Sequence, residues 1–494
     1  MRVYQQVLGA FLFVFLMLES SGLAQPQGGA ATVYVRKNAS TPAAKADLVA
    51  LQTAIAKMKA LDCSDPRSWY YQGAIHWVPN DSRNRSNLKA GNPFCVAYDG
   101  TDATLKEAWN NCTHSSTRPE RHFLIWHRLY IFYLEEIVRD LSGKADFALP
   151  YWDYCNPAYR VMPEIFRSPA DPSNSLYVAA RCTALNQGKP IDSEMDPALD
   201  LTSLMQLTNP TLFNGQIDNA PHGLMHDYIG GGKDDETFFN PIYNVGGISG
   251  LMSNVPSAAF DPIFWLHHSN IDYIWQNWLI SPYGEKPNLT SLQAAPMPYT
   301  FFRADKTMVT YTVEEAYELA FSLPVTYDNM GTESMNPTTA GEGKRFARSA
   351  KPNALKGRET TFSAKLDIDQ PATLKLANET TKRTVLHLIV SFPKEPTGTY
   401  SVYVRNSSEK KLDSREQLLG VMNFFGAGHH AMHGLDHGDH NKKMTKEFRF
   451  DITNKIDVNK FDGNLDILIK KIGNKKETDD VTIDEIHIES WPVK

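Results

Sequence analysis

Histidines that could bind a metal ion are concentrated in two short apolar stretches, PHGLMHD at 221–227 and DPIFWLHHSNID at 261–272. His222 and His226 are four residues apart, so on a helix both rings project from one face and can bind the same ion. The second stretch can supply a third ligand, because a chain that buries Phe264 and its apolar neighbours would not bury two histidines without partners. Three imidazoles without a thiolate or carboxylate suit copper, zinc or iron.

A second group of histidines lies nearer the N-terminus. His76 stands in YYQGAIHW, His114 in CTH and His127 in WHR, and His122 precedes the apolar run FLIWHRLY. The histidines before residue 300 therefore form two groups of four. Two groups of a residue type that binds transition metals predict two metal ions.

The elements that must position these histidines are predicted to be helices. Apolar residues recur with helical period at 45–61, 123–141 and 260–279, and strand-like alternation is scarce in this part of the chain. Beyond residue 358 the pattern changes to period two, as in TVLHLIVSF and TYSVYVR. The predicted fold is therefore a mainly α domain followed by a β-sandwich C-terminal domain.

Four segments resemble, in this order, the type-3 copper proteins, which are tyrosinases, catechol oxidases and haemocyanins. They are CTH followed by FLIWHRLY, LPYWDY at 149–154, PHGLMHDYIGG at 221–231 and DPIFWLHHSNID at 261–272. The resemblance spans roughly residues 60–330 and implies a four-helix bundle in which two copper ions, each held by three histidines, bridge dioxygen. By position it implies these ligands: His76, His114 and His127 for the first copper, and His222, His226 and His268 for the second.

The same resemblance assigns roles to residues beside the ligands. His267 would lie next to the metal site without binding the ion, and Phe264 would pack beside the ligands and form a wall of the substrate site. Asp272 could orient a ligand ring by accepting its other N–H. The alternative for Asp272 is an ordinary helix carboxylate paired with a cation. Arg128 is predicted to make a structural ion pair.

Cysteine usage adds a covalent prediction. In the family a cysteine two residues before the middle ligand forms a thioether to its ring, which implies a Cys112–His114 bond. That leaves Cys63 with Cys95 and Cys155 with Cys182 as disulfides, although an odd Cys95 is an open alternative. The gap from His114 to His127 is longer than the family usually shows, so His122 is an alternative middle ligand.

Three positions near the second copper indicate the substrate. Many tyrosinases that hydroxylate monophenols have Asn after the first ligand, where this chain has Gly223, and a nearby Glu that Asp218 would replace. Some catechol oxidases place a bulky Phe over the metal at the position of Val255. The resemblance therefore implies an open site that oxidises diphenols better than it hydroxylates monophenols.

The chain is predicted to contain four parts. Residues 1–24 have a positive charge, an apolar run and small residues at the end, as in a secretory signal peptide, which predicts an exported, extracellular protein. Residues 25–327 would form the dicopper catalytic domain, 328–358 a linker with a possible site for an activating protease, and 359–494 a β-rich domain that shields the copper site. No later segment is apolar enough to span a membrane. A net charge of -6 with mixed signs argues against a nucleic-acid partner.

The predicted function is a secreted polyphenol oxidase that uses dioxygen to oxidise o-diphenols, and possible monophenol substrates, to o-quinones. It would be latent until the C-terminal domain is cut off or displaced. A haemocyanin-like oxygen carrier is the alternative from another class, and a zinc hydrolase with the same ligands is a third. The C-terminal tract GAGHHAMHGLDHGDH, which contains His429 and His440, could bind copper or zinc or be a solvated loop.

Overall fold

The computed structural model describes residues 32–77, 122–243, 245–295, 299–330, 344–368, 382–396, 398–406, 417–427, 443–453, 455, 463–472 and 479–492. Met1–Val33 and Tyr34–Lys494 are separate compact units, and the architecture below is that of the second. The predicted signal peptide at 1–24 lies outside the described residues, as does the histidine tract at 429–440. Among the described helices, none combines the length and the apolar character that crossing a membrane would require.

The N-terminal part of the second unit is helical. Its helices are α1 (Lys45–Ala60), α2 (Trp69–His76), α4 (Phe123–Ser142), α5 (Thr183–Asn186), α6 (Asp196–Leu199), α7 (Thr202–Met205), α8 (Pro210–Ile217), η7 (Asp218–Gly223), α9 (Leu224–Ile229), α10 (Val255–Ala258), α11 (Ile263–Ile280), α12 (Leu289–Gln293) and α13 (Val313–Ser322). The three helices predicted from periodicity at 45–61, 123–141 and 260–279 are confirmed as α1, α4 and α11.

Local signals explain where the histidine-bearing helices begin and end. The Ser68 side chain accepts a hydrogen bond from the Tyr71 amide and starts α2. Gly143 ends α4 in a left-handed conformation with φ 76°, which glycine adopts without a Cβ clash. Asp261 Oδ1 accepts from the Ile263 amide at 3.0 Å and so starts α11.

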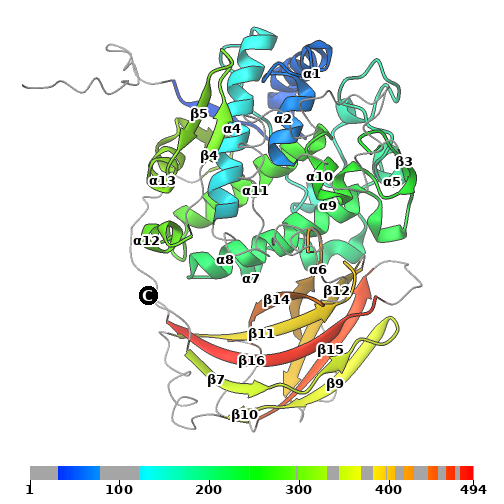
Figure 1. Ribbon diagram of the computed structural model, residues 1–494, viewed down its shortest axis with the longest axis vertical. Coiled ribbons are helices and arrows are strands. Elements are labelled where there is room, and N and C mark those ends of the chain that lie inside the picture. The colour runs from blue at the N-terminus through cyan, green and yellow to red at the C-terminus, as the bar shows by residue number, and fades with distance from the viewer. Residues whose placement is uncertain are drawn as a thin grey trace, which may run out of the picture. The chain divides into compact units, whose positions relative to one another are not determined.

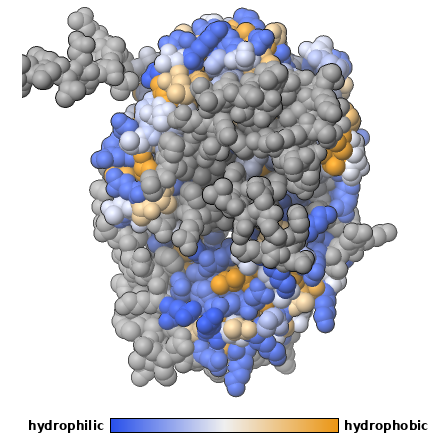
Figure 2. Space-filling view, viewed as in Figure 1, coloured by the Kyte–Doolittle hydropathy of each residue, from blue (hydrophilic) through white to orange (hydrophobic). Residues whose placement is uncertain are grey.

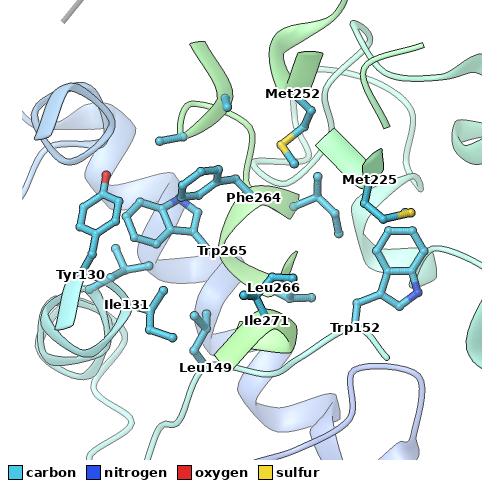
Figure 3. Packing of buried hydrophobic residues seen from close by; sticks show 14 of the residues in the cluster. Tyr130, Ile131, Leu149, Trp152, Met225, Met252, Phe264, Trp265, Leu266 and Ile271 are labelled. Atoms are coloured by element: carbon cyan, nitrogen blue, oxygen red, sulfur yellow. The ribbon is translucent and has the colours of Figure 1, made fainter. Parts of the chain in front are cut away.

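Helices α4 and α11 pack against each other through large apolar side chains. Figure 3 shows Phe264 and Trp265 of α11 close to Tyr130 and Ile131 of α4, and all four are fully buried or nearly so. The Tyr130 and Trp265 ring centroids are 4.5 Å apart. This contact, between two helices far apart in the sequence, holds the histidines of both helices in one core.

The C-terminal part is built from strands. They are β7 (Lys344–Ser349), β8 (Asn353–Ala354), β9 (Glu359–Lys365), β10 (Asp367–Ile368), β11 (Lys382–Phe392), β12 (Thr399–Asn406), β13 (Leu418–Met422), β14 (Met444–Asp451), β15 (Asn464–Ile472) and β16 (Thr482–Pro492). A six-stranded sheet has the order β10-β7-β16-β11-β14, with β8 also on β16, and a four-stranded sheet has the order β13-β12-β15-β9 (Figure 1). Both sheets contribute to one buried cluster, for example Leu386 from the first and Val402 from the second.

The remaining strands pair within the helical part. Strand β1 (Tyr34–Arg36) pairs in parallel with β6 (Val325–Tyr327), β2 (Phe238–Asn240) pairs with β3 (Val245–Ile248), and β4 (Tyr299–Phe302) with β5 (Met308–Tyr311). The β1–β6 pair joins the two ends of the helical part.

The described surface of the protein carries few exposed large apolar side chains, and hydrophilic residues prevail on the described part of the face in Figure 2.

The linker predicted at 328–358 differs from the structure. Residues 344–349 form β7, which pairs with β16, and 353–354 form β8 on the same strand. The sequence did not predict these strands because basic residues interrupt the apolar pattern. Arg348, for example, lies on the exposed side of the sheet and pairs with Glu485. The proposed protease target at Lys344 and Arg345 therefore lies in a hydrogen-bonded strand, while 331–343 lie outside the described residues.

Candidate metal centre

Five of the six predicted ligands lie in the described residues, and all five are buried. His76 ends α2, His127 lies in the first half of α4, His222 in η7, His226 in α9 and His268 in α11. Their exposed fractions are between 0% and 3%. Five helical segments thus deliver imidazoles to one place. His114 and His122 are the two candidates for the middle ligand of the first copper. Of these, His114 lies outside the described residues, as does Cys112.

The second group is tightly clustered. One ligand atom from each of four residues, His222, His226, His267 and His268, lies within 4.8 Å of the others. A kink at Ala220, with φ -150° and ψ 132°, interrupts the helix before His222. After the kink the chain is helical again, so the predicted spacing of four residues brings the centroids of the His222 and His226 rings within 4.6 Å of each other.

The first group adjoins the second. The rings of His127 and His268 stack with their centroids 4.2 Å apart and their planes at 7°. The His76 and His127 centroids are 5.7 Å apart. Phe264 touches both groups, at 4.9 Å from His76 and 4.2 Å from His268. The structure therefore brings together the two histidine groups that the sequence separates.

Backbone carbonyls set the tautomer of three rings. The Nδ1–H of His127 donates to the Phe123 carbonyl at 2.8 Å, and that of His226 to the Met252 carbonyl at 2.9 Å. His222 donates from Nδ1 to the Asp218 carbonyl at 3.1 Å. A nitrogen that donates leaves the other nitrogen, Nε2, with a lone pair for a metal ion.

Burial favours the neutral form of His226, His267 and His268 by lowering their pKa values. Loss of solvation first, and then the neighbouring His222 and His267, hold the pKa of His226 well below its ordinary value. Burial, followed by the proximity of His127 and His222, lowers the pKa of His268 in the same way. Neutral imidazole is the form that binds a metal ion. The group fits copper, because His226 Nε2, His267 Nε2 and both nitrogens of His268 have no hydrogen-bond partner among the described residues.

His267 and His268 both belong to the cluster, but their surroundings differ. The Tyr154 hydroxyl lies 2.9 Å from His267 Nδ1 and ties this ring to the segment after α4. His268 has no such tether and lies between the two groups, where it stacks on His127. His268 therefore adjoins rings of both histidine groups.

Both ring nitrogens of His122 contact other groups of the protein. Its Nδ1 lies 2.6 Å from the Tyr299 hydroxyl and its Nε2 lies 2.9 Å from the Ala295 carbonyl. Both ring nitrogens are therefore engaged with β4 and the turn after α12. These contacts disfavour His122 as the middle ligand of the first copper.

Of the two roles considered for Asp272, the structure favours the ion pair. Asp272 accepts from Arg128 Nε at 2.5 Å, from Arg36 Nη1 at 2.8 Å and from the Tyr327 hydroxyl at 2.5 Å. It is thus the ion-paired helix carboxylate, and the ion pair predicted for Arg128 is confirmed. Asp218 Oδ1 instead lies 2.8 Å from His222 Nδ1. Asp218 therefore orients a ligand ring, the role that the sequence suggested for Asp272.

The predicted open mouth is not what the structure shows. Val255 is buried, with 1% exposed, at the start of α10. Phe425, which follows β13 in the C-terminal part, stacks on His226 with centroids 4.2 Å apart and planes at 15°. Its ring lies 6.0 Å from His222. A residue that no motif indicated therefore covers the second group, because the covering contact depends on the packing of two distant segments.

Neighbouring residues fix the position of Phe425. The Asn423 side-chain oxygen accepts from the Phe425 amide at 2.9 Å, and the Asn423 amide donates to Asn219 Oδ1 at 2.8 Å. Asn219 also donates to the Val421 carbonyl. A Cβ added at Gly223 would lie 2.8 Å from Asn423 Oδ1 and 3.3 Å from Phe425 Cβ. Glycine at this position therefore allows the covering segment to approach.

The predicted disulfide between Cys155 and Cys182 is wrong, because both thiols are free. Burial raises the pKa of both thiols, which keeps them protonated and unreactive. Cys182 is anchored elsewhere by its amide, which donates to the Ile229 carbonyl at 2.7 Å. Cys63 is disulfide-bonded. Its predicted partner, Cys95, lies outside the described residues.

Known proteins with similar sequences share this histidine-bearing region. Residues 66–203 and 181–280 match the family described as the common central domain of tyrosinase. A tyrosinase of Hahella sp. (strain CCB-MM4) is 34% identical over 253 residues, which cover 46% of this chain and 49% of that protein. A chloroplastic polyphenol oxidase of Vitis vinifera is 26% identical over 352 residues, covering 64% and 51%. The chain thus spans about half the length of these curated relatives.

Solved structures extend the likeness to both parts of the chain. A latent aurone synthase (polyphenol oxidase) has a TM-score of 0.62 at 19% identity and covers 94% of this chain and 91% of its own. Latent apple tyrosinase has a TM-score of 0.58 at 18% identity, covering 94% and 99%. At this identity the likeness shows the fold, a helical core with a C-terminal β-rich domain.

Proposed function

The chain belongs to the type-3 copper family through its tyrosinase central domain, and from this premise we propose that it is a dicopper polyphenol oxidase. It would oxidise o-diphenols to o-quinones with dioxygen. The observation that carries the proposal is the convergence of buried imidazoles from α2, α4, η7, α9 and α11, four of which form a cluster of ligand atoms made of histidines alone. We further infer that these helices form the family's four-helix bundle and that the two sheets form a β-sandwich.

The proposed ligands are those that the resemblance implied: His76, His114 and His127 for one copper, and His222, His226 and His268 for the other. Two copper ions held by imidazoles together accept two electrons, the number that one o-diphenol loses on becoming an o-quinone. The protein would fix the rings through the carbonyls of Phe123 and Met252, and exclude water with Phe264.

Asp218 and Gly223 favour diphenols as substrates. The Asp218 carboxylate contacts His222, so it is less available to hold a water that would deprotonate a monophenol. Gly223 offers no side chain to help it. The wall of the substrate site would comprise Phe264, with Val255 buried behind it.

We propose that the described form is latent, because Phe425 occupies the face of His226 on which a phenol ring would stack. Displacement of the C-terminal part would expose that face. A cavity of about 740 Å³ lies between the two parts, lined by residues such as Asn219, Val421 and Lys446. The interface is therefore incompletely packed, which lowers the cost of separating it. An activating protease would cut in 331–343 more readily than at Lys344 or Arg345, which belong to β7.

The test is oxygen consumption by copper-loaded protein with catechol and with tyrosine, before and after limited proteolysis. We expect little oxidation before cleavage, rapid oxidation of catechol after it, and slower oxidation of tyrosine. Reversible oxygen binding without oxidation in either state would identify an oxygen carrier. One zinc and no copper in the purified protein would identify the hydrolase alternative.

We also propose that the protein is exported after removal of residues 1–24. The plant relatives are named as chloroplastic, so the two destinations make different predictions for the mature N-terminus. N-terminal sequencing of protein recovered from the medium should start at Gln25. Retention of the mature protein inside a plastid would contradict export.

A further inference from the structure

A second pair of buried histidines lies in the C-terminal part, far along the chain from the copper site. His387 of β11 and His487 of β16 are directly opposite each other in the six-stranded sheet. Their rings stack with centroids 4.3 Å apart and planes at 19°. They are 2% and 7% exposed. Two imidazoles are therefore held side by side at a fixed separation by the register of two neighbouring strands.

Three carboxylates face these rings from the same side of the sheet. Glu447 Oε1 of β14 lies 2.5 Å from His387 Nδ1. The Glu489 carboxylate of β16 reaches both rings, with one oxygen 3.2 Å from His387 Nε2 and the other 3.4 Å from His487 Nε2. Glu485 Oε1 lies 3.3 Å from His487 Nδ1 but is also paired with Arg348 at 2.6 Å.

Hydrogen bonding leaves part of this cluster unsatisfied. His387 Nε2 and His487 Nδ1 are buried, and among the described residues neither makes a hydrogen bond of acceptable geometry, despite the nearby carboxylates. A buried polar atom without a hydrogen bond is costly, so such atoms commonly bind water or an ion. The ligand atoms of His387, Glu447 and His487 lie within 4.8 Å of one another.

We propose that His387, His487 and Glu489 form a mononuclear site for a divalent cation of the zinc or copper(II) class, separate from the dicopper centre, with Glu447 holding the other nitrogen of the His387 ring. Two imidazoles with a carboxylate are a ligand set of this class. Ligand atoms around a tetrahedral ion with bonds of about 2.0 Å lie about 3.3 Å apart, and the Glu489 oxygens lie at 3.2 Å from His387 Nε2 and 3.4 Å from His487 Nε2. Small side-chain rotations would therefore admit the ion.

The site has a structural consequence. An ion bound there would tie β11 and β16 together at one point of the sheet. Val385, two residues before His387 on the same face, belongs to the buried cluster of the helical part. Arg383 on that face donates to the Gln206 carbonyl at 3.3 Å. The ion would therefore stiffen the sheet beside its interface with the helical part.

The test measures zinc bound by copper-loaded full-length protein. The histidine tract would bind zinc itself, so the background variant has His429, His430, His433, His437 and His440 all replaced by Ala. After dialysis against zinc, elemental analysis should find one tightly held zinc in this background and none in the same background with His487→Ala. Arg348→Ala is the matched control, because it changes the same face without removing a proposed ligand, and it should keep the zinc.

Glu489→Gln is the second variant, since it keeps the shape of the shared ligand while removing its charge. It should weaken zinc binding at least about tenfold while leaving the fold, judged by circular dichroism, unchanged. Copper(II) in place of zinc should give the paramagnetic resonance of a mononuclear ion with hyperfine lines from two nitrogens. Absence of the extra zinc from the background, or its survival in His487→Ala, would overturn the proposal. None of these readouts needs oxidase activity, so their failure is distinguishable from failure of the proposed function.

Discussion

Both histidine clusters of this protein bury imidazoles, but the groups that contact the ring nitrogens differ between them. Around the dicopper group the second ring nitrogens are held mainly by backbone carbonyls, such as those of Phe123 and Asp218. Around His387 and His487 they are faced by carboxylates from neighbouring strands. A helix can offer its own carbonyl one turn back, whereas the carbonyls of a sheet are already used in the ladder.

The difference affects the charge of each cluster. Burial lowers the pKa of His226 and His268, so the helical cluster is a set of neutral ligands. Burial also opposes protonation of His387, but the adjacent carboxylates of Glu447 and Glu489 outweigh it and raise its pKa. The helical cluster therefore presents neutral ligands even when no metal ion is bound. In the sheet cluster, charge pairing between histidine and carboxylates provides stabilisation when no metal ion is bound.

The largest expected effect separates the two clusters by activity. His268→Ala should abolish catechol oxidation and lower the copper content, because it removes the ring that stacks on His127 between the two groups. His387→Ala, a buried histidine of the sheet, should leave catechol oxidation after proteolysis unchanged. Copper analysis and oxygen consumption check both. Full activity of His268→Ala would show that His267 is the third ligand.

The next effect concerns a carboxylate that pairs with two cations and contacts no predicted ligand. Asp272→Ala should lower the free energy of unfolding by about 3–5 kcal/mol, because it leaves two buried guanidinium groups, those of Arg36 and Arg128, without their shared partner. Copper bound per folded molecule should stay the same. Urea unfolding and copper analysis measure the two quantities. A loss of copper with unchanged stability would restore Asp272 as a residue that orients a ligand.

A smaller effect is expected for the carboxylate that touches a ligand. Asp218→Ala should weaken copper binding about 10–100-fold, because His222 loses the carboxylate that orients its ring. Its Nδ1 keeps the Asp218 carbonyl, so binding should not be lost. Competition with a chelator measures the affinity. Equal affinities of wild type and Asp218→Ala would mean that the backbone carbonyl alone holds the ring.

The smallest effect concerns the contact between the two parts of the chain. Phe425→Ala should raise catechol oxidation by the uncleaved protein roughly fivefold, since the stacked contact with His226 is worth about 1 kcal/mol. Phe425→Leu, which keeps apolar bulk but not the ring, should raise it less. Both variants should match the wild type after proteolysis. An unchanged latent rate in Phe425→Ala would assign latency to other contacts of the interface.

Much of the candidate site could be predicted because its signals are local. The run FLIWHRLY has helical period and formed α4, and the spacing of His222 and His226 placed their rings together even after the kink at Ala220. The strands at 344–349 were missed because β7 is short and basic, and its pairing with β16 is not visible in its own sequence.

The sequence by itself determined the ligand type, the helices that carry most of the ligands and the family, because residue chemistry and helical periodicity act over a few neighbouring positions. Only the tertiary structure decided that Asp218 rather than Asp272 contacts a ligand ring, that Cys155 and Cys182 stay apart, and that Phe425 covers His226. The same holds for the pairing of His387 with His487, which depends on strand register. The contact of Phe425 with His226 and that of His387 with His487 each join segments far apart in the chain, so their distances are set by packing rather than by spacing.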